Sequence, residues 1–266
     1  QDLLNDLIAA SLAAGGDAVE AVLADRRALS VGVRLGALEE VEREESRDLG
    51  LRVFVGRRQA TVSGSDFSER ARGRLIERAV AMARLAPEDP YAGLAPGDRL
   101  ARAPFPDLEL FDPTEPSAED LEERARAAED TARAVAGVTN SEGGLASWST
   151  THWLMATSGG FMGPHQVSAF SVSASVIAGE GDGMERGGEG RSTRWQADLP
   201  SSQSIGALAA KRAVARVGAR KIGSVTAPVI FENRIATSII SPFVGAISGP
   251  SVARGTSFLK DKLGQQ

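Results

Sequence analysis

Two histidines, His152 and His165, carry the only imidazoles of this 266-residue chain, which contains no cysteine. The lack of cysteine excludes thiolate nucleophiles, disulfides and cysteine-ligated zinc or iron–sulfur sites. A catalytic zinc takes three protein ligands, so the two imidazoles would need a carboxylate beside them. The flanking acids, Glu142 and Glu180, lie at the far ends of the segments that carry the histidines. We therefore interpret the histidines as strand residues with local hydrogen bonds rather than as metal ligands.

A long β-hairpin is predicted to position both histidines. Residues 144–178 are rich in Ser, Thr and β-branched side chains, and apolar residues alternate with serines along 170–176. Gly159 and Gly160 are typical of a turn between two such strands. With the turn there, the numbers of cross-strand partners sum to about 317–319, so the two histidines are expected nearly opposite each other, where their rings could meet.

The glycine-dense stretch from Gly179 to Gly190 is predicted to interrupt regular structure as a loop. It is not a P-loop, because no Gly-Lys-Ser/Thr follows and no helix opens directly after it. Asp182 and Glu185 within it could act as an acid and a base, but paired carboxylates in loops are common. The Gly-x-Ser-x-Gly sequence that is typical of a serine nucleophile does not occur.

Periodicity of the apolar residues predicts helices and strands that come in blocks, which favours an α+β fold over strict βαβ alternation. The predicted helices span residues 2–14, 68–85, 117–136 and 203–217. Short strands of an antiparallel meander are expected at 19–23, 29–35, 39–45 and 49–55, with a short buried strand at 229–231. Residues 87–116 hold seven prolines and are expected to cross the domain irregularly.

Charge and hydropathy limit the partners. The net charge of −5 gives no electrostatic reason to expect nucleic acid, although residues 203–262 carry nine cations against two acids. The uncharged stretch 235–253 contains two prolines and two glycines and is too polar for a membrane span, so we expect a buried segment and no membrane partner. The acidic start lacks the features of a signal peptide. A cytoplasmic location agrees with the lack of cysteine.

Six short motifs then occur in an order that one family shares. They are Asp89-Pro-Tyr-Ala-Gly-Leu94, Asn140-Ser-Glu-Gly143, Gly181-Asp-Gly-Met-Glu-Arg186, Ala227-Pro-Val-Ile-Phe231, Val244-Gly-Ala-Ile247 and Ser257-Phe-Leu-Lys-Asp-Lys-Leu-Gly264. By these motifs the chain resembles the TldD/PmbA family along its whole length, and within it the PmbA (TldE) branch, once called modulator of DNA gyrase. Gly187-Gly188 depart from the Asp-Tyr that usually follows the arginine in this family. The motif residues Asn140, Ser141, Glu142, Gly143, Asp182, Gly183 and Arg186 have no role that the resemblance assigns.

The resemblance implies a domain plan that the chain fills only in part. Residues 1–116 are expected to form an N-terminal α+β domain, with an N-terminal helix, an antiparallel meander and helices. Residues 117–266 would hold a helix, the long hairpin and the start of a peptidase-like, β-rich C-terminal half whose remainder is absent from this sequence.

A metallopeptidase is implied as well, built from a TldD-like and a PmbA-like subunit. The TldD-like branch carries His-Glu-x-x-x-His on a helix, which holds zinc and activates its water. Aligned through the shared Val-Gly step, the corresponding positions here are Ser241, Pro242 and Ala246. A hydroxyl, a pyrrolidine ring and a methyl group cannot replace two imidazoles and a carboxylate. We therefore expect neither metal nor catalytic residues in this subunit, and zinc only in the TldD-like partner.

The resemblance thus implies a non-catalytic subunit of a heterodimeric zinc peptidase acting on small unfolded peptides, in peptide maturation or antitoxin turnover. Two alternatives stay open. The chain could be a stand-alone hydrolase that uses its histidines or a serine. It could also be a non-enzymatic protein that modulates DNA gyrase or a toxin–antitoxin system. A homodimer through the heterodimer surface is a further option.

Overall fold

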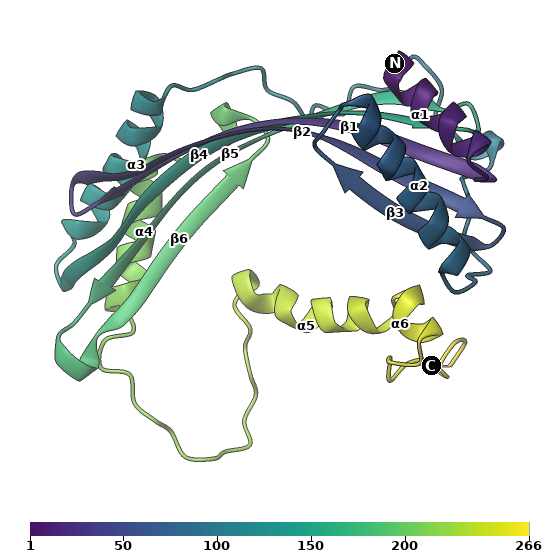
Figure 1. The fold of residues 1–266 in the computed structure, drawn as a ribbon. Coiled ribbons are helices and arrows are strands. Elements are labelled where there is room, and N and C mark those ends of the chain that lie inside the picture. The colour runs from purple at the N-terminus through teal and green to yellow at the C-terminus, as the bar shows by residue number, and fades with distance from the viewer. Residues whose placement is uncertain (266) are drawn as a thin grey trace. The chain divides into compact units, whose positions relative to one another are not determined.

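The structure, a computed structural model, describes residues 1–265 and divides into two compact units, residues 1–219 and 220–266. The first unit is built on one six-stranded antiparallel sheet with the order β3-β2-β1-β4-β5-β6 (Figure 1). Its strands are β1 (Ala18–Arg34), β2 (Ala37–Val55), β3 (Arg58–Gly64), β4 (Val138–Thr157), β5 (Met162–Ala178) and β6 (Glu185–Thr193). Its helices are α1 (Asp2–Ala13), α2 (Glu69–Leu85), α3 (Ala118–Arg133) and α4 (Ser202–Val214), with one-turn 3₁₀ segments η1 (Gly97–Arg99), η2 (Gly181–Gly183) and η3 (Gln196–Asp198).

The predicted α+β class and the helix starts are confirmed. Ser68 caps α2 by accepting a hydrogen bond from the Ala71 N–H at 3.3 Å. At the start of α3, Ser117 and Asp120 form the predicted capping box, in which each side chain accepts a backbone N–H of the other. The hairpin of β4 and β5 turns at residues 158–161, as the two glycines indicated.

The prediction of many short strands is wrong, because β1 and β2 are each continuous. The runs 19–23 and 29–35 are parts of β1, and the runs 39–45 and 49–55 are parts of β2. The charged stretch in the middle of β1 breaks the apolar alternation, but its pairing with β2 continues in register from Ala18 to Gly32. Backbone hydrogen bonds maintain a strand where its side chains face water on both sides of the sheet.

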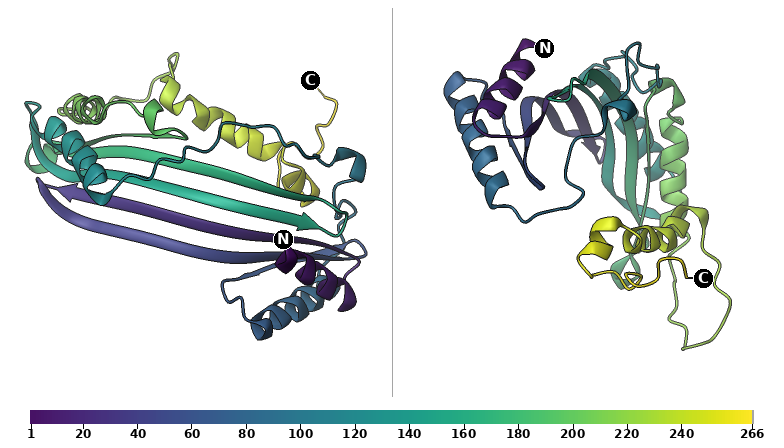
Figure 2. Two further views of the ribbon diagram at one scale, coloured as in Figure 1. Left: turned by 90° about the horizontal axis from the view of Figure 1, so that it is seen from above. Right: turned by 90° about the vertical axis from the view of Figure 1, so that its right-hand side faces the viewer.

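All four helices of the first unit pack on one face of the sheet. The odd-numbered residues of β1 enter two hydrophobic clusters, one with α1 and α2 around Val19 and Ala21, the other with α3 and α4 around Val31 and Val33. The sheet twists along its length between the two helix pairs (Figure 2). Since side chains of a strand alternate between faces, the even-numbered residues of β1 lie on the other face.

The glycine-dense stretch after the hairpin is irregular only over residues 179–184, which corrects the prediction for residues 185–190. After the η2 turn it continues as β6, the edge strand beside β5. A Cβ atom at Gly187 would lie 2.2 Å from the Ala213 backbone nitrogen and 2.5 Å from the Ala209 carbonyl oxygen of α4. Glycine is therefore required at this position for the close approach of helix and strand, and Gly187-Gly188 belong to a regular element.

The second unit, described by itself, contains α5 (Asn233–Ala246) and α6 (Gly249–Ala253). Residues 229–231 are not the predicted buried strand: they are exposed, and no strand of the described residues pairs with them. The uncharged stretch 235–253 forms these two helices, and most of its residues are exposed, which corrects the expectation of a buried segment. No helix within residues 1–265 has the length and apolar character needed to cross a bilayer.

Candidate functional site

The sheet face opposite the four helices is the most extensive candidate surface of the first unit, and we name it the uncovered face. Most of its side chains are only half-buried, and serine is the most frequent residue in its middle. Its central side chains come from three neighbouring strands and are Ala24, Arg26, Ala28 and Ser30 of β1, Ser147, Ser149, Thr151 and Trp153 of β4, and His165, Val167, Ala169, Ser171, Ser173 and Ser175 of β5. Small hydroxyl side chains make the middle of this face shallow and polar.

A hollow of about 520 Å³ interrupts the uncovered face. Arg26, Ser149 and Arg194 are among its lining residues, and Trp153 stacks on His165 at its side with 5.6 Å between ring centroids. Arg26 is also 3.5 Å from Glu44 of β2, an exposed ion pair that is weak in water. The hollow therefore offers aromatic and cationic surface but no arrangement of a nucleophile with a base.

The two histidines do not meet, which corrects the expectation from the hairpin geometry. His152 pairs with Gln166 across the strands, and His165 pairs with Trp153. The two histidine numbers sum to 317, one less than the 318 of true partners, and a one-residue offset puts side chains on opposite faces. His152 lies on the helix side, where its Nε2 is 3.2 Å from the Thr150 hydroxyl and its ring meets Phe111 edge-on.

Two of the family-motif segments come together at one end of the uncovered face. Glu142, beside a bulge in β4, forms an ion pair with Arg186 of β6 and accepts a hydrogen bond of 2.7 Å from the Ser175 hydroxyl. The motifs are 44 residues apart in sequence at these positions, and β5 lies between their strands. The pair is largely exposed on the arginine side, so it organises the strand ends more than it stabilises the fold.

The remaining motif residues serve the local backbone. The Asn140 and Ser141 side chains accept hydrogen bonds from the N–H groups of the next residue and of Gly143, at 2.8 and 2.9 Å. Asp182 and Gly183 lie in the exposed η2 turn that leads into β6. None of these four residues meets the Glu142–Arg186 pair through a hydrogen bond in the described part of the chain.

Asp112 is a buried acid that the sequence analysis did not single out. Its carboxylate accepts hydrogen bonds from the backbone N–H groups of Thr114 and Gln196, at 2.9 and 2.8 Å. Burial acts to raise the pKa of Asp112, but the hydrogen bonds from Thr114 and Gln196 outweigh it and lower the pKa below its ordinary value. Asp112 thereby links the proline-rich segment 87–116 to the segment before α4. The Asp-Pro-Thr sequence is typical of a turn and could have indicated this role.

The three positions aligned with the family's zinc motif lie on α5. Ser241 and Pro242 are exposed and Ala246 is buried. One hydroxyl is the only polar side-chain group that they supply, so this donor set does not fit zinc. Across residues 1–265, no cluster of three or more His, Asp or Glu side chains could hold a metal ion.

Three models of one protein family match the chain in order. The first domain of the PmbA/TldA metallopeptidases matches residues 19–83, the central domain residues 111–217, and the C-terminal domain residues 224–266. The chain is 36% identical over 260 residues to a protein named metalloprotease PmbA from Escherichia coli O157:H7, covering 97% of this chain and 58% of that protein. A PmbA homologue of Haemophilus influenzae is 36% identical over 252 residues, with 94% and 56% covered. The chain thus spans a little over half the length of these relatives.

Solved structures share the fold at low sequence identity. A protein from Bacteroides thetaiotaomicron, named as a proposed modulator of DNA gyrase, superposes with a TM-score of 0.89 at 22% identity and covers 99% of this chain and 60% of its own. TldE from Thermococcus kodakarensis gives a TM-score of 0.65 at 18% identity, with 79% and 47% covered. Together with the sequence relatives, the three consecutive domain matches establish that the chain belongs to the PmbA/TldD metallopeptidase family.

Proposed function

We propose that the chain is part of a PmbA/TldE-type subunit that pairs with a TldD-like subunit and lacks a catalytic metal of its own. The observation that carries this proposal is the replacement of the zinc motif by Ser241, Pro242 and Ala246 on α5. A zinc peptidase needs imidazole or carboxylate ligands and a base beside the metal, and these residues provide neither. The partner subunit would hold the zinc and perform the hydrolysis.

The part that we assign to the first unit is to present an extended peptide to the partner on its uncovered face. A peptide can lie over small hydroxyl side chains such as Ser149 and Ser171 without a steric barrier, and its main chain can bond to the edge strand β6 beside this face. The aromatic pair of Trp153 and His165 would contact apolar side chains of the peptide. The substrate class, a small unfolded peptide, and a cytoplasmic location are parts of the same proposal.

The stand-alone hydrolase finds less support, because the two histidines lie on opposite faces and cannot act on one substrate bond. Direct modulation of gyrase through DNA contact would require a cationic surface, and the central residues of β2 on the uncovered side include Glu40, Glu42 and Glu44. These acids would repel a phosphate backbone.

The test combines the chain with a TldD-like subunit and measures complex formation by sedimentation and peptide cleavage by mass spectrometry. Ser149→Trp fills the hollow and should slow cleavage by the pair about tenfold or more. A tenfold effect corresponds to a loss of about 1.4 kcal/mol in peptide binding free energy. Arg70→Trp on the exposed surface of α2 is the matched control and should not alter the rate. If no complex forms, or the chain assembles only with itself, the pairing is disproved. Equal rates for both variants would refute the role of the uncovered face.

A further inference from the structure

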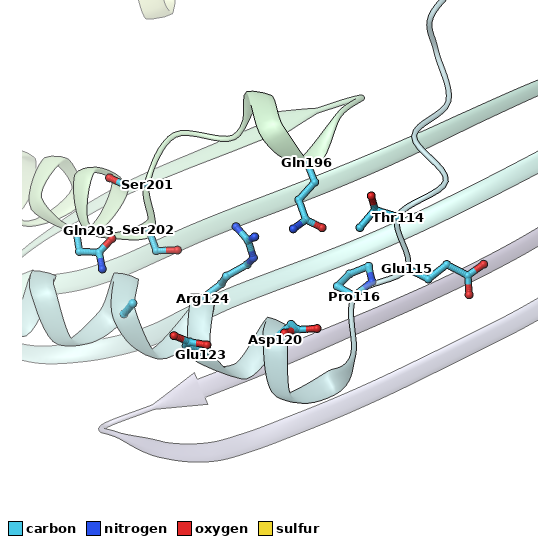
Figure 3. Close-up of a pocket in the computed structure, with 11 residues that line it drawn as sticks. Thr114, Glu115, Pro116, Asp120, Glu123, Arg124, Gln196, Ser201, Ser202 and Gln203 are labelled. Carbon is cyan, nitrogen blue, oxygen red and sulfur yellow. The ribbon is translucent and has the colours of Figure 1, made fainter.

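A second site is indicated on the opposite, helix-bearing side of the sheet. A cavity of about 410 Å³ opens between the first turns of α3 and α4 and the segment that precedes α3 (Figure 3). Its walls include Arg124 and Asp120 of α3, Gln196 of η3, and Ser202 at the start of α4. This volume lies within the range of pockets that bind small molecules. None of these residues takes part in the uncovered face.

The α4 wall presents hydrogen-bond donors without acceptors. Ser201 caps the helix by accepting the Ser204 N–H at 3.2 Å, but the N–H groups of Ser202 and Gln203 precede the first intrahelical bonds. The first turn of α4 contains no acidic residue to offset the positive end of the helix dipole. The Ser202 side chain is only 8% exposed and lines the cavity, and its hydroxyl forms no hydrogen bond with the described residues but is not fully buried. In Figure 3 this hydroxyl points toward Arg124.

Arg124 adds a cation that makes no ion pair within the described residues, although its charge helps to lower the pKa of Asp120, one turn earlier on α3. The other two arginines of α3 have acidic partners on the same helix, Arg126 with Glu122 at 2.5 Å and Arg133 with Asp130 at 3.9 Å. Arg124 is half-buried and makes neither an ion pair within 4.0 Å nor a hydrogen bond to any residue in the range 1–265. A half-buried guanidinium with five free donors is a strong group for recognising a carboxylate.

Acceptors face the same cavity. The Gln196 Oε1 atom is buried and has no hydrogen-bond partner within the described chain, a state that usually costs free energy. Asp120 contributes a carboxylate of which one oxygen accepts the Ser117 N–H. Hydrogen bonds from Ser117 lower the pKa of Asp120, so it is charged at neutral pH. Glu115 and Glu123 line the cavity as well, so a simple anion would meet Arg124 favourably but would be repelled by three carboxylates.

A ligand that carries both a negative and a positive group can bond to the donors of α4 and Arg124 and to the acceptors of Gln196 and Asp120 at once. We propose that the cavity binds a small zwitterion, a dipeptide or free amino acid. Its carboxylate would lie against the start of α4, Ser202 and Arg124, and its ammonium group against Gln196 Oε1 and Asp120. The inference does not depend on the proposed function, because it rests on orphaned donors and acceptors outside the uncovered face.

The experiment titrates the chain with alanyl-alanine by isothermal calorimetry at low salt. Saturable one-site binding is expected. N-acetyl-alanyl-alanine lacks the ammonium and alanyl-alanine amide lacks the carboxylate, so each should bind at least about tenfold more weakly, the loss that follows from removing one charge-assisted contact. Absence of saturable binding, or equal binding of the blocked forms, would overturn the proposal. Saturable binding of inorganic phosphate together with no dipeptide binding would show an anion site instead and also overturn it.

Two variants locate the binding. Arg124→Gln removes the free cation without breaking an ion pair and should weaken alanyl-alanine binding about tenfold. Arg70→Gln, an equally drastic loss of charge on the exposed surface of α2, should leave it unchanged. Ser202→Ala removes a hydroxyl that bonds to nothing in the fold, so the protein should stay folded while affinity falls severalfold. Wild-type affinity in both Arg124→Gln and Ser202→Ala would refute the assignment.

Discussion

Replacement of Glu129 should expose how the long strands β1 and β2 are joined to the helix layer. Glu129 lies on α3 and is completely buried. Its two carboxylate oxygens accept hydrogen bonds from the Leu35 and Gly36 N–H groups, at 2.7 and 2.9 Å. These two residues form the turn between β1 and β2 and both have positive φ angles, 52° and 76°. The carboxylate therefore holds a two-residue turn, including one non-glycine residue in the left-handed region, against the helix.

The magnitude follows from the two backbone groups that would lose their acceptor. A hydrogen bond to a charged group contributes about 1.5–3 kcal/mol, so the loss of both part-buried bonds in Glu129→Ala should lower the free energy of unfolding by about 3–6 kcal/mol. The higher helix propensity of alanine recovers only a few tenths of a kcal/mol. Glu129→Gln keeps one oxygen but turns an amide N–H₂ toward the other backbone donor, so about half of that loss is expected.

The assay is urea unfolding followed by circular dichroism, with amide hydrogen exchange at the turn. Leu35 and Gly36 should exchange faster in Glu129→Ala, and more than amides in the distant β3. Asp130→Asn is the matched control, since Asp130 is exposed and 3.9 Å from Arg133, and should change stability by less than about 0.5 kcal/mol. A loss below about 1 kcal/mol for Glu129→Ala, or unchanged exchange at the turn, would refute the reasoning.

Two other perturbations test the packing and the charge pattern. Gly206→Ala in α4 should destabilise the fold by about 1–3 kcal/mol or more in thermal unfolding, because its Cβ would lie 2.0 Å from the Ala128 carbonyl oxygen. Gly73→Ala in α2 has nothing within 4 Å of the new Cβ and should stabilise by up to about 1 kcal/mol; equal effects at both sites would contradict the close packing of α3 and α4. Asp112→Asn should reduce stability at neutral pH. Since the pKa of Asp112 is lowered in the folded state, its stabilisation is present above the ordinary pKa of 3.8 and is lost as the pH falls below that value. The unfolding free energies of wild type and variant should therefore converge in acid. A difference in unfolding free energy that grows in acid would disprove this.

The helices and the main hairpin could be predicted because their signals are local. Ser68 and Ser117 act as caps through atoms three residues away, and the Gly159-Gly160 turn needs only its own backbone freedom. The continuity of β1 could not be read from periodicity, because a strand that faces water on both sides of its middle has no apolar alternation to reveal it. Gly187 is typical of a loop by composition, whereas in the structure its lack of a side chain allows β6 to contact α4, a later element of the chain.

The candidate site shows the same difference between local signals, which the sequence displays, and contacts between distant segments, which it does not. The cross-strand sum came within one residue of the true register, but one residue decides the face, and so His152 and His165 were wrongly expected to meet. The Glu142–Arg186 pair was present among the motif residues, yet only the order of the strands brings these two segments together. The orphaned Ser202 and Gln196 of the second cavity carry no sequence signal, because satisfaction of a polar group is a property of the packed fold.

The most direct test of the central claim is the zinc content and peptidase activity of the purified chain, measured alone and after mixing with a TldD-like subunit. With Ser241, Pro242 and Ala246 at the motif positions, elemental analysis should find no stoichiometric zinc in the chain alone, and cleavage of an unstructured peptide should appear only with the partner present. One tightly bound zinc per chain together with cleavage by the isolated chain would contradict the account.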